Sequence, residues 1–256
     1  RFRCYNNECV YNIQYGATSR RNSPRTKGVA SFDAFQFPVD TVHTTVINDM
    51  IFGCSNDNPN IDFANGQISG ILGLSRGPDG LASQLAKRGI IENRFSYCLV
   101  PFHDVLRQPT ILRFGDHIPL PVGNLQYTDF ILYPGRNHYY VELQDGLGGS
   151  LIDSGTVVST IDENTIGRNA YKEAGFRDFV TMTLHFEGGD YFIDGKYMHY
   201  FADEEEEGEG YFCVALFKSS KTILGAWQQQ NMRIIYDMNG GGFQWITETC
   251  ANDHFP

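Results

Sequence analysis

Leu151-Ile152-Asp153-Ser154-Gly155-Thr156 is an aliphatic run that ends in an aspartate, two hydroxyl residues and a glycine. Such a run is typical of a buried strand, and the glycine lets the backbone turn tightly after the acid. The pattern predicts that the Asp153 carboxylate lies at a strand end among hydroxyl and amide donors. Average residue usage produces a string of this kind in roughly one or two per hundred chains of this size, so a simple turn capping a strand stays open as an interpretation.

The chemistry available to Asp153 depends on a second carboxylate. Two carboxylates a few ångströms apart cannot both ionise, so they share one proton. Such a pair can hold a water, remove its proton during attack on a peptide carbonyl, and donate a proton to the leaving nitrogen. With a partner aspartate, Asp153 therefore indicates amide hydrolysis at acidic pH.

The composition is that of an ordinary globular protein. The 256 residues are 41% hydrophobic and 20% charged, which allows one large unit or two lobes. The formal net charge of -10 repels phosphate backbones and anionic lipids, so we expect no nucleic-acid partner. No stretch approaches the roughly 20 apolar residues of a membrane helix, so we expect no membrane span. A chain that starts at Arg1 without Met is interpreted as soluble and already processed.

Short strands are expected to dominate the structure. Runs rich in β-branched and aromatic residues end at Gly, Asn or Asp turns, as at 10–15, 139–143 and 232–236. Helical periodicity is restricted to 80–88 and 163–174. The predicted fold class is all-β with a few short helices.

Cysteine usage indicates an oxidising compartment. The six cysteines are an even number and show no zinc-ligand spacing, which favours disulfides, with buried free thiols as the alternative. The acidic run 204–207 could attract calcium, but solvated loops are the usual fate of such runs, and we expect neither a metal nor a cofactor. Motifs of serine hydrolases, P-loop proteins, dinucleotide-binding proteins and zinc proteases are lacking.

Taken in order, the motifs resemble those of the plant pepsin-like aspartic proteases of the nepenthesin and nucellin type. The matching stretches lie along nearly the whole chain: 9–16, 51–54, 69–77, 83–85, 94–98, 139–141, 152–156, 223–225, 228–231 and 236–237. Each stretch is modest alone, and their common order makes the resemblance specific.

The resemblance implies a bilobal pepsin-like acid protease fold. Residues 1–135 would be the remainder of the N-terminal lobe, with the flap and the first hydrophobic-Gly loop at 71–73. Residues 136–256 would be the C-terminal lobe. Each lobe would have an Asp-[Ser/Thr]-Gly loop crossed by its own aliphatic-aliphatic-Gly strand, 71–73 in the first lobe and 223–225 beside Asp153 in the second. Asp153 would be the catalytic aspartate of that lobe. The substrate-binding residues would be Tyr15 on the flap, together with Gly155 and Thr156, which support Asp153.

Several departures from the family suggest missing segments. The first Asp-[Ser/Thr]-Gly should lie well before Tyr15, where only 14 residues precede, and Asp40-Thr41-Val42 has no glycine and follows the flap. The joins near Gly146 and Gly175 are shorter than in the family. The resemblance also pairs Cys98 with Cys250. It places the partners of Cys54, of Cys213 and of the Cys4/Cys9 region in stretches that this chain lacks.

The leading hypothesis is a secreted or vacuolar, monomeric aspartic endopeptidase that acts on protein or peptide substrates. One alternative is a catalytically silent binding protein, like the xylanase inhibitors or seed globulins that share this fold. Another is an inert processed fragment. The intact stretch from Asp153 to Thr156 favours the enzyme, because a silent relative has no chemical reason to keep it.

Overall fold

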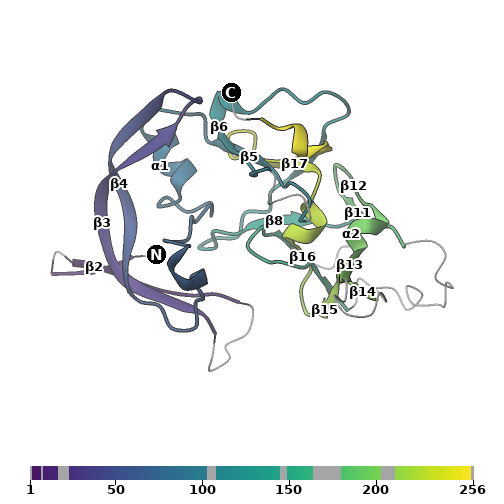
Figure 1. The fold of residues 1–256 in the computed structure, drawn as a ribbon, viewed down its shortest axis with the longest axis horizontal. Helices are drawn as coiled ribbons and strands as arrows, with labels where there is room; N and C mark the ends of the chain where they lie inside the picture. The colour runs from purple at the N-terminus through teal and green to yellow at the C-terminus, as the bar shows by residue number, and fades with distance from the viewer. Residues whose placement is uncertain are drawn as a thin grey trace. The chain divides into compact units, whose positions relative to one another are not determined.

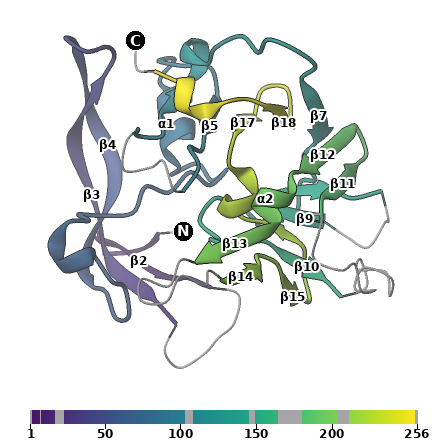
Figure 2. The ribbon, with the colours of Figure 1, turned by 45° about the vertical axis from the view of Figure 1, so that its right-hand side comes forward.

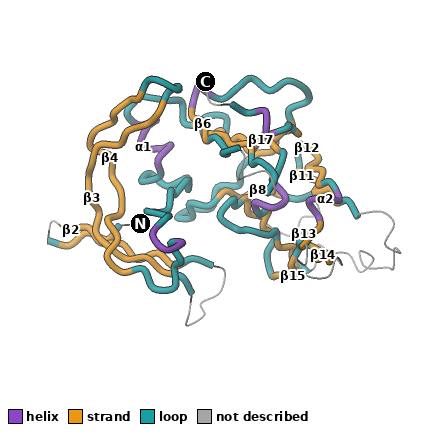
Figure 3. Tube along the Cα trace, viewed as in Figure 1, coloured by secondary structure: helices purple, strands orange, loops and turns teal. Residues whose placement is uncertain are grey.

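The computed structural model describes residues 2–6, 8–16, 23–102, 108–144, 149–163, 180–202 and 211–254. The chain forms two compact units, one running from the N-terminus to Gln84 and the other from Leu85 to His254. Strands dominate both units and the helices are short (Figure 3), so the all-β prediction is confirmed. The proposed lobe boundaries at 135 and 136 stay a prediction.

The first unit is built on a four-stranded antiparallel sheet. Its strands follow chain order: β1 (Arg3–Tyr5), β2 (Glu8–Gln14), β3 (Arg25–Pro38) and β4 (Thr44–Asp57). In the β1–β2 hairpin Cys4 lies opposite Cys9, and the two form a disulfide with their Cα atoms 3.9 Å apart. The expectation that these cysteines find partners outside the chain was therefore wrong, because antiparallel register already places them side by side.

The two longest strands, β3 and β4, lie side by side along their length (Figure 1). Asp40 organises the turn between them, since its carboxylate accepts the backbone N–H groups of Val42 and His43 at 2.7 Å. The 3-10 turn η1 (Ala64–Gly66) and the helix α1 (Leu81–Lys87) follow. Gln84 on α1 joins β4 by two 2.9 Å bonds to the backbone of Ile51. The helix predicted at 80–88 is confirmed.

The second unit contains an antiparallel five-stranded sheet that carries most of the aromatic core. In spatial order its strands are β6 (Leu112–Phe114), β5 (Arg94–Cys98), β17 (Met232–Asp237), β18 (Gly242–Thr247) and β7 (Gln126–Asp129). Phe95 stacks on Tyr236 at 4.6 Å between ring centroids, and Phe243 stacks on Trp245 at 5.2 Å. Offset aromatic pairs of this kind add to the stabilisation that burial provides.

A second, mixed sheet positions the candidate site. Its spatial order is β15 (Phe217–Ser219), β10 (Thr160–Asp162), β16 (Ile223–Leu224), β9 (Gly149–Ile152) and β8 (Tyr139–Glu142) (Figure 2). Two hairpins accompany it: β11 (Met182–Phe186) with β12 (Gly189–Ile193), and β13 (His199–Ala202) with β14 (Tyr211–Val214). The short helical elements are α2 (Gly195–Met198), η2 (Gly115–His117), η3 (Ala226–Gln229) and η4 (Cys250–Asn252).

The remaining cysteines behave as the resemblance implies. Cys98 and Cys250 form a buried disulfide with their Cα atoms 5.2 Å apart, as predicted. Cys54 and Cys213 are exposed and have no disulfide partner within the described part of the chain. Glu163 is the only described residue of the predicted helix at 163–174. The join near Gly175 and the acidic run 204–207 also lie outside the described residues.

A buried ion-pair network holds the C-terminal segment beside the Cys98–Cys250 disulfide. Arg233, with a side chain 1% exposed, donates to both oxygens of Glu248 at 2.9 and 2.7 Å and lies 3.0 Å from Asp253. Arg113 donates to Asp253 at 2.6 Å. Burial tends to raise the pKa of Asp253, but the hydrogen bonds from Arg113 and Arg233 outweigh it and hold this pKa below its ordinary value.

We expect Asp253→Asn to lower the free energy of unfolding by about 3 kcal/mol at neutral pH, because two arginines lose their buried counter-charge. A carboxylate with a lowered pKa stabilises the fold above its unfolded pKa of about 3.9 and loses that effect as pH falls through the folded value. The difference from wild type should therefore persist to about pH 4 and shrink below it. Urea unfolding from pH 7 to pH 2 measures this. Asp116→Asn, which alters an exposed pair with Arg94, is the control, and an equal loss in both variants would contradict the prediction.

Candidate functional site

Asp153 directly follows the strand β9, which is paired in parallel with β16. The register places Leu151 beside Ile223 and Ile152 beside Leu224. The pairing extends past the strand end, because the Asp153 N–H donates to the Leu224 carbonyl at 3.1 Å. Ile152 and Leu224 are buried, whereas Asp153 is exposed. The predicted packing of 223–225 beside the Asp153 loop is confirmed.

The two supporting residues named from the sequence both bind the Asp153 carboxylate. The Gly155 N–H donates to one oxygen at 2.9 Å, and the Thr156 hydroxyl donates to the other at 2.8 Å. An ionised carboxylate offers about four acceptor positions, so these bonds fix its orientation and leave acceptor capacity for a water or substrate. Gly155 and Thr156 thus act as orienting groups in this structure, and their contact with a substrate stays a prediction.

Gly225 passes so close to the Asp153 loop that no side chain fits. A Cβ at this position would lie 2.7 Å from the Thr156 carbonyl oxygen and 2.9 Å from the Val158 carbonyl carbon. Three backbone N–H groups then tie the crossing segment to the loop: Gly225 to the Ser159 hydroxyl, Ala226 to Thr156 and Trp227 to Val157, at 2.8 to 2.9 Å. The loop is therefore held by β16 and η3 along its whole length.

The corresponding sequence in the first unit, Ile71-Leu72-Gly73, is built differently. It is not in a strand, no described strand pairs with it, and Ile71 and Leu72 are 55% and 56% exposed. A Cβ on Gly73 would meet nothing within 4 Å. The aspartate loop that this segment would cross is not in this sequence, so that crossing stays a prediction.

These two glycines give a matched pair of variants. We expect Gly225→Ala to lower the free energy of unfolding of the 256-residue chain by about 2 to 3 kcal/mol, because the new methyl group meets rigid backbone. Gly73→Ala, made in open space, should change it by less than about 0.5 kcal/mol. Thermal and denaturant unfolding measure both. Similar stabilities for the two variants would show that the close crossing at Gly225 is not rigid.

Tyr15 lies at the end of β2, where its backbone N–H donates to the Pro24 carbonyl at 2.9 Å. Partial burial is the main cause that raises the pKa of the Tyr15 phenol, and the nearby Tyr11 adds to the effect. The phenol therefore stays neutral. Residues 17–22 of the predicted flap lie outside the described residues. Tyr15 and Asp153 belong to different units, so the closure of the flap over the acid stays a prediction.

Sequence reasoning gave no role to Tyr97 and Gln229, although both lie in stretches that carried the family resemblance. Both side chains are buried, and the Tyr97 hydroxyl donates to the Gln229 side-chain oxygen at 2.5 Å. Burial, the largest influence, raises the pKa of Tyr97, and the nearby charge of Asp153 adds to the effect. Tyr97 lies in the short strand β5 and Gln229 in the polar run 228–231, and neither stretch carries a local signal that the two side chains meet.

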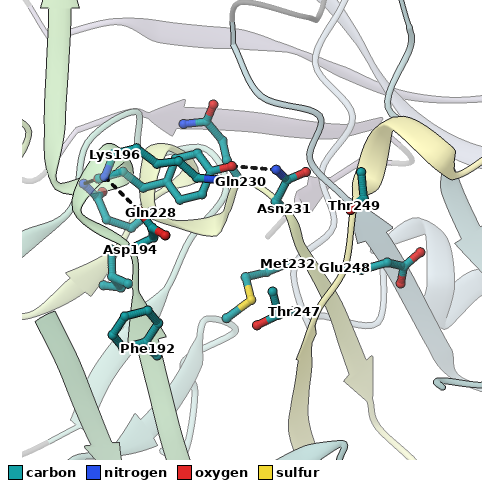
Figure 4. A pocket seen from close by; sticks show the side chains of 12 residues that line it. Phe192, Asp194, Lys196, Gln228, Gln230, Asn231, Met232, Thr247, Glu248 and Thr249 are labelled. Carbon is teal, nitrogen blue, oxygen red and sulfur yellow. Dashed lines mark hydrogen bonds between the residues drawn. The ribbon is translucent and has the colours of Figure 1, made fainter. Parts of the chain in front are cut away.

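A separate pocket of about 280 Å³ lies between α2 and the β17–β18 pair (Figure 4). Its polar lining is largely bonded within the protein: Asn231 donates to the Tyr197 hydroxyl at 2.6 Å, and Gln230 donates to the Trp227 carbonyl at 2.8 Å. Asp194 accepts the Lys196 backbone N–H. Asp153 does not line this pocket, which therefore carries no part of the candidate chemistry.

Within the described residues, no group of three His, Cys, Asp or Glu side chains could hold a metal ion. None of the described helices is long and apolar enough to cross a membrane.

Comparison with known proteins gives relatives of two kinds. Residues 1–116 match the family described as "Xylanase inhibitor N-terminal". The chain is 25% identical to aspartic proteinase nepenthesin-2 of Nepenthes gracilis, over 97% of this chain but 62% of that protein. This chain thus spans less than two thirds of that relative's length.

Two solved structures with the same fold are seed globulins. Conglutin gamma, a basic 7S globulin from lupine seeds, superimposes with a TM-score of 0.68 at 17% identity, covering 97% of this chain and 77% of that one. Basic 7S globulin from soybean gives a TM-score of 0.62 at 15% identity, covering 95% and 80%. The chain therefore has a pepsin-like all-β fold, and its sequence is similar to plant aspartic proteinases over nearly its whole length.

Proposed function

We propose that this chain is part of a plant aspartic endopeptidase of the nepenthesin type, in which Asp153 is one of two catalytic carboxylates. The observation that carries the proposal is the Asp153 carboxylate itself, which is exposed at the end of a buried strand and oriented by Gly155 and Thr156. The second carboxylate would come from a part of the protein that this sequence does not include. The similarity to nepenthesin-2 supports the same assignment.

In this mechanism the chain supplies a fixed oxygen acceptor. The hydroxyl of Thr156 and the amide of Gly155 restrain the carboxylate, so that its free acceptor positions point away from its own loop. With a partner acid, one carboxylate removes a proton from the attacking water while the other protonates the amide nitrogen. Preorganisation of this kind lowers the barrier because little rearrangement accompanies the reaction.

The setting of the proposed enzyme is the secretory pathway. Two disulfides, Cys4–Cys9 and Cys98–Cys250, are expected of proteins that fold in an oxidising compartment. We propose that the protein is secreted or vacuolar and acts as a monomer on protein or peptide substrates.

A silent binding protein is the second candidate function. It is favoured by the match of residues 1–116 to the xylanase-inhibitor family and by the fold shared with the two seed globulins. In that case the Asp153 loop would be a structural element, and its replacement would affect stability more than function.

We expect the full-length protein to hydrolyse denatured protein at acidic pH, and Asp153→Asn to reduce the rate by at least about a thousandfold. The amide cannot share the proton, so activity is lost. It keeps the shape of the side chain, so folding should be nearly unchanged. Peptide release assayed from pH 2 to pH 7 should give a bell-shaped profile set by the coupled pair.

Asp190→Asn is the control, because Asp190 is an exposed aspartate paired with His185. It should keep wild-type activity. Full-length protein that is folded but inert over the whole range would contradict the enzyme, and binding of a xylanase would then establish the second candidate.

A further inference from the structure

A chain of hydrogen bonds runs behind the Asp153 loop. The Leu224 carbonyl accepts the Asp153 backbone N–H at 3.1 Å and the Gln229 side-chain amide at 2.8 Å. The oxygen of the same Gln229 amide accepts the Tyr97 hydroxyl at 2.5 Å. Tyr97 is thereby linked to the backbone of Asp153 through the Gln229 amide and the Leu224 carbonyl.

The Tyr97 hydroxyl is bonded to two buried side chains. A phenol has one proton to donate and two lone pairs to accept. The proton goes to Gln229, which leaves the oxygen to accept from the Tyr236 hydroxyl, 3.0 Å away. The tyrosines and Gln229 are buried, so no water is available to replace a lost partner.

The path connects three distant parts of the chain. Tyr97 is on β5, Gln229 is in η3, and Asp153 follows β9. The first two elements belong to the core, whereas the loop that they hold is exposed. A buried polar network with every member paired is rigid, and loss of one member leaves the others unsatisfied.

We propose that Tyr97 is a positioning residue for Asp153. It does not touch a substrate: it orients the Gln229 amide, which in turn holds the Leu224 carbonyl against the Asp153 N–H. This proposal rests on the proposed function for its catalytic consequence, but the positioning itself can be measured without catalysis.

The first test measures the loop directly. In Tyr97→Phe, the Asp153 amide should exchange with deuterium about tenfold faster relative to the amides of β17. The reason is that Gln229, which holds the Leu224 carbonyl against this amide, loses its bond to Tyr97. Tyr191→Phe is the matched control: Tyr191 is equally buried, but its hydroxyl bonds the Gln228 backbone at 3.1 Å. It should leave the relative exchange of Asp153 unchanged.

The second test measures catalysis in the full-length protein. Tyr97→Phe should reduce kcat about ten- to a hundredfold with KM nearly constant, because a displaced catalytic group loses transition-state stabilisation rather than binding. In a Gln229→Met background the same change should reduce kcat much less, since the contact is already gone. A role in stability alone would give equal effects in both backgrounds.

The outcomes separate the two proposals. Unchanged exchange at Asp153 in Tyr97→Phe overturns the positioning role, and so does faster exchange with an unchanged kcat. Faster exchange in a protein that is inert even as wild type upholds the positioning of the loop and rejects the proposed enzyme. If Tyr97→Phe does not fold, Gln229→Met breaks the same path, and its Asp153 amide must then show the same faster exchange for the proposal to stand.

Discussion

The parallel pairing of β9 with β16 is the constraint on which the candidate site depends. It brings two segments about seventy residues apart in sequence into contact. Asp153 is thereby placed at the point where the chain leaves the buried strand β9. Because Gly225 presents no side chain, the backbone that follows β16 can pass directly against the loop after the acid. The hydrogen bonds behind the loop, which meet at the Leu224 carbonyl, require this close crossing.

Support for the loop comes from groups of different kinds on its two sides. On the exposed side, Gly155 and Thr156 hold the carboxylate oxygens with short local bonds that involve only neighbours in sequence. On the buried side, Tyr97 and Gln229 connect the loop to a core of stacked aromatic rings. Local bonds of the first kind form in any turn of this sequence, whereas the second kind exists only after the sheets have assembled. The second kind therefore decides how rigid the acid is.

The two units differ in how completely they are packed. The second unit, which carries Asp153, has buried aromatics, a buried disulfide and the Arg233 network in its core. In the first, the long β3–β4 hairpin carries exposed apolar residues, and Ile71 and Leu72 have no described strand beside them. The more complete packing is thus in the unit that carries the carboxylate, where a catalytic group needs restraint.

The sequence by itself determined the all-β class, the strand that delivers Asp153, and the two residues that orient it, because strand periodicity and a tight Asp-Ser-Gly-Thr turn are local properties. It also paired Cys98 with Cys250 through a family resemblance. It missed the Cys4–Cys9 bond and gave no role to Tyr97 or Gln229. Those depend on which strands become neighbours. Register and the distance between remote side chains are set by packing of the whole chain, so only the tertiary structure decided them.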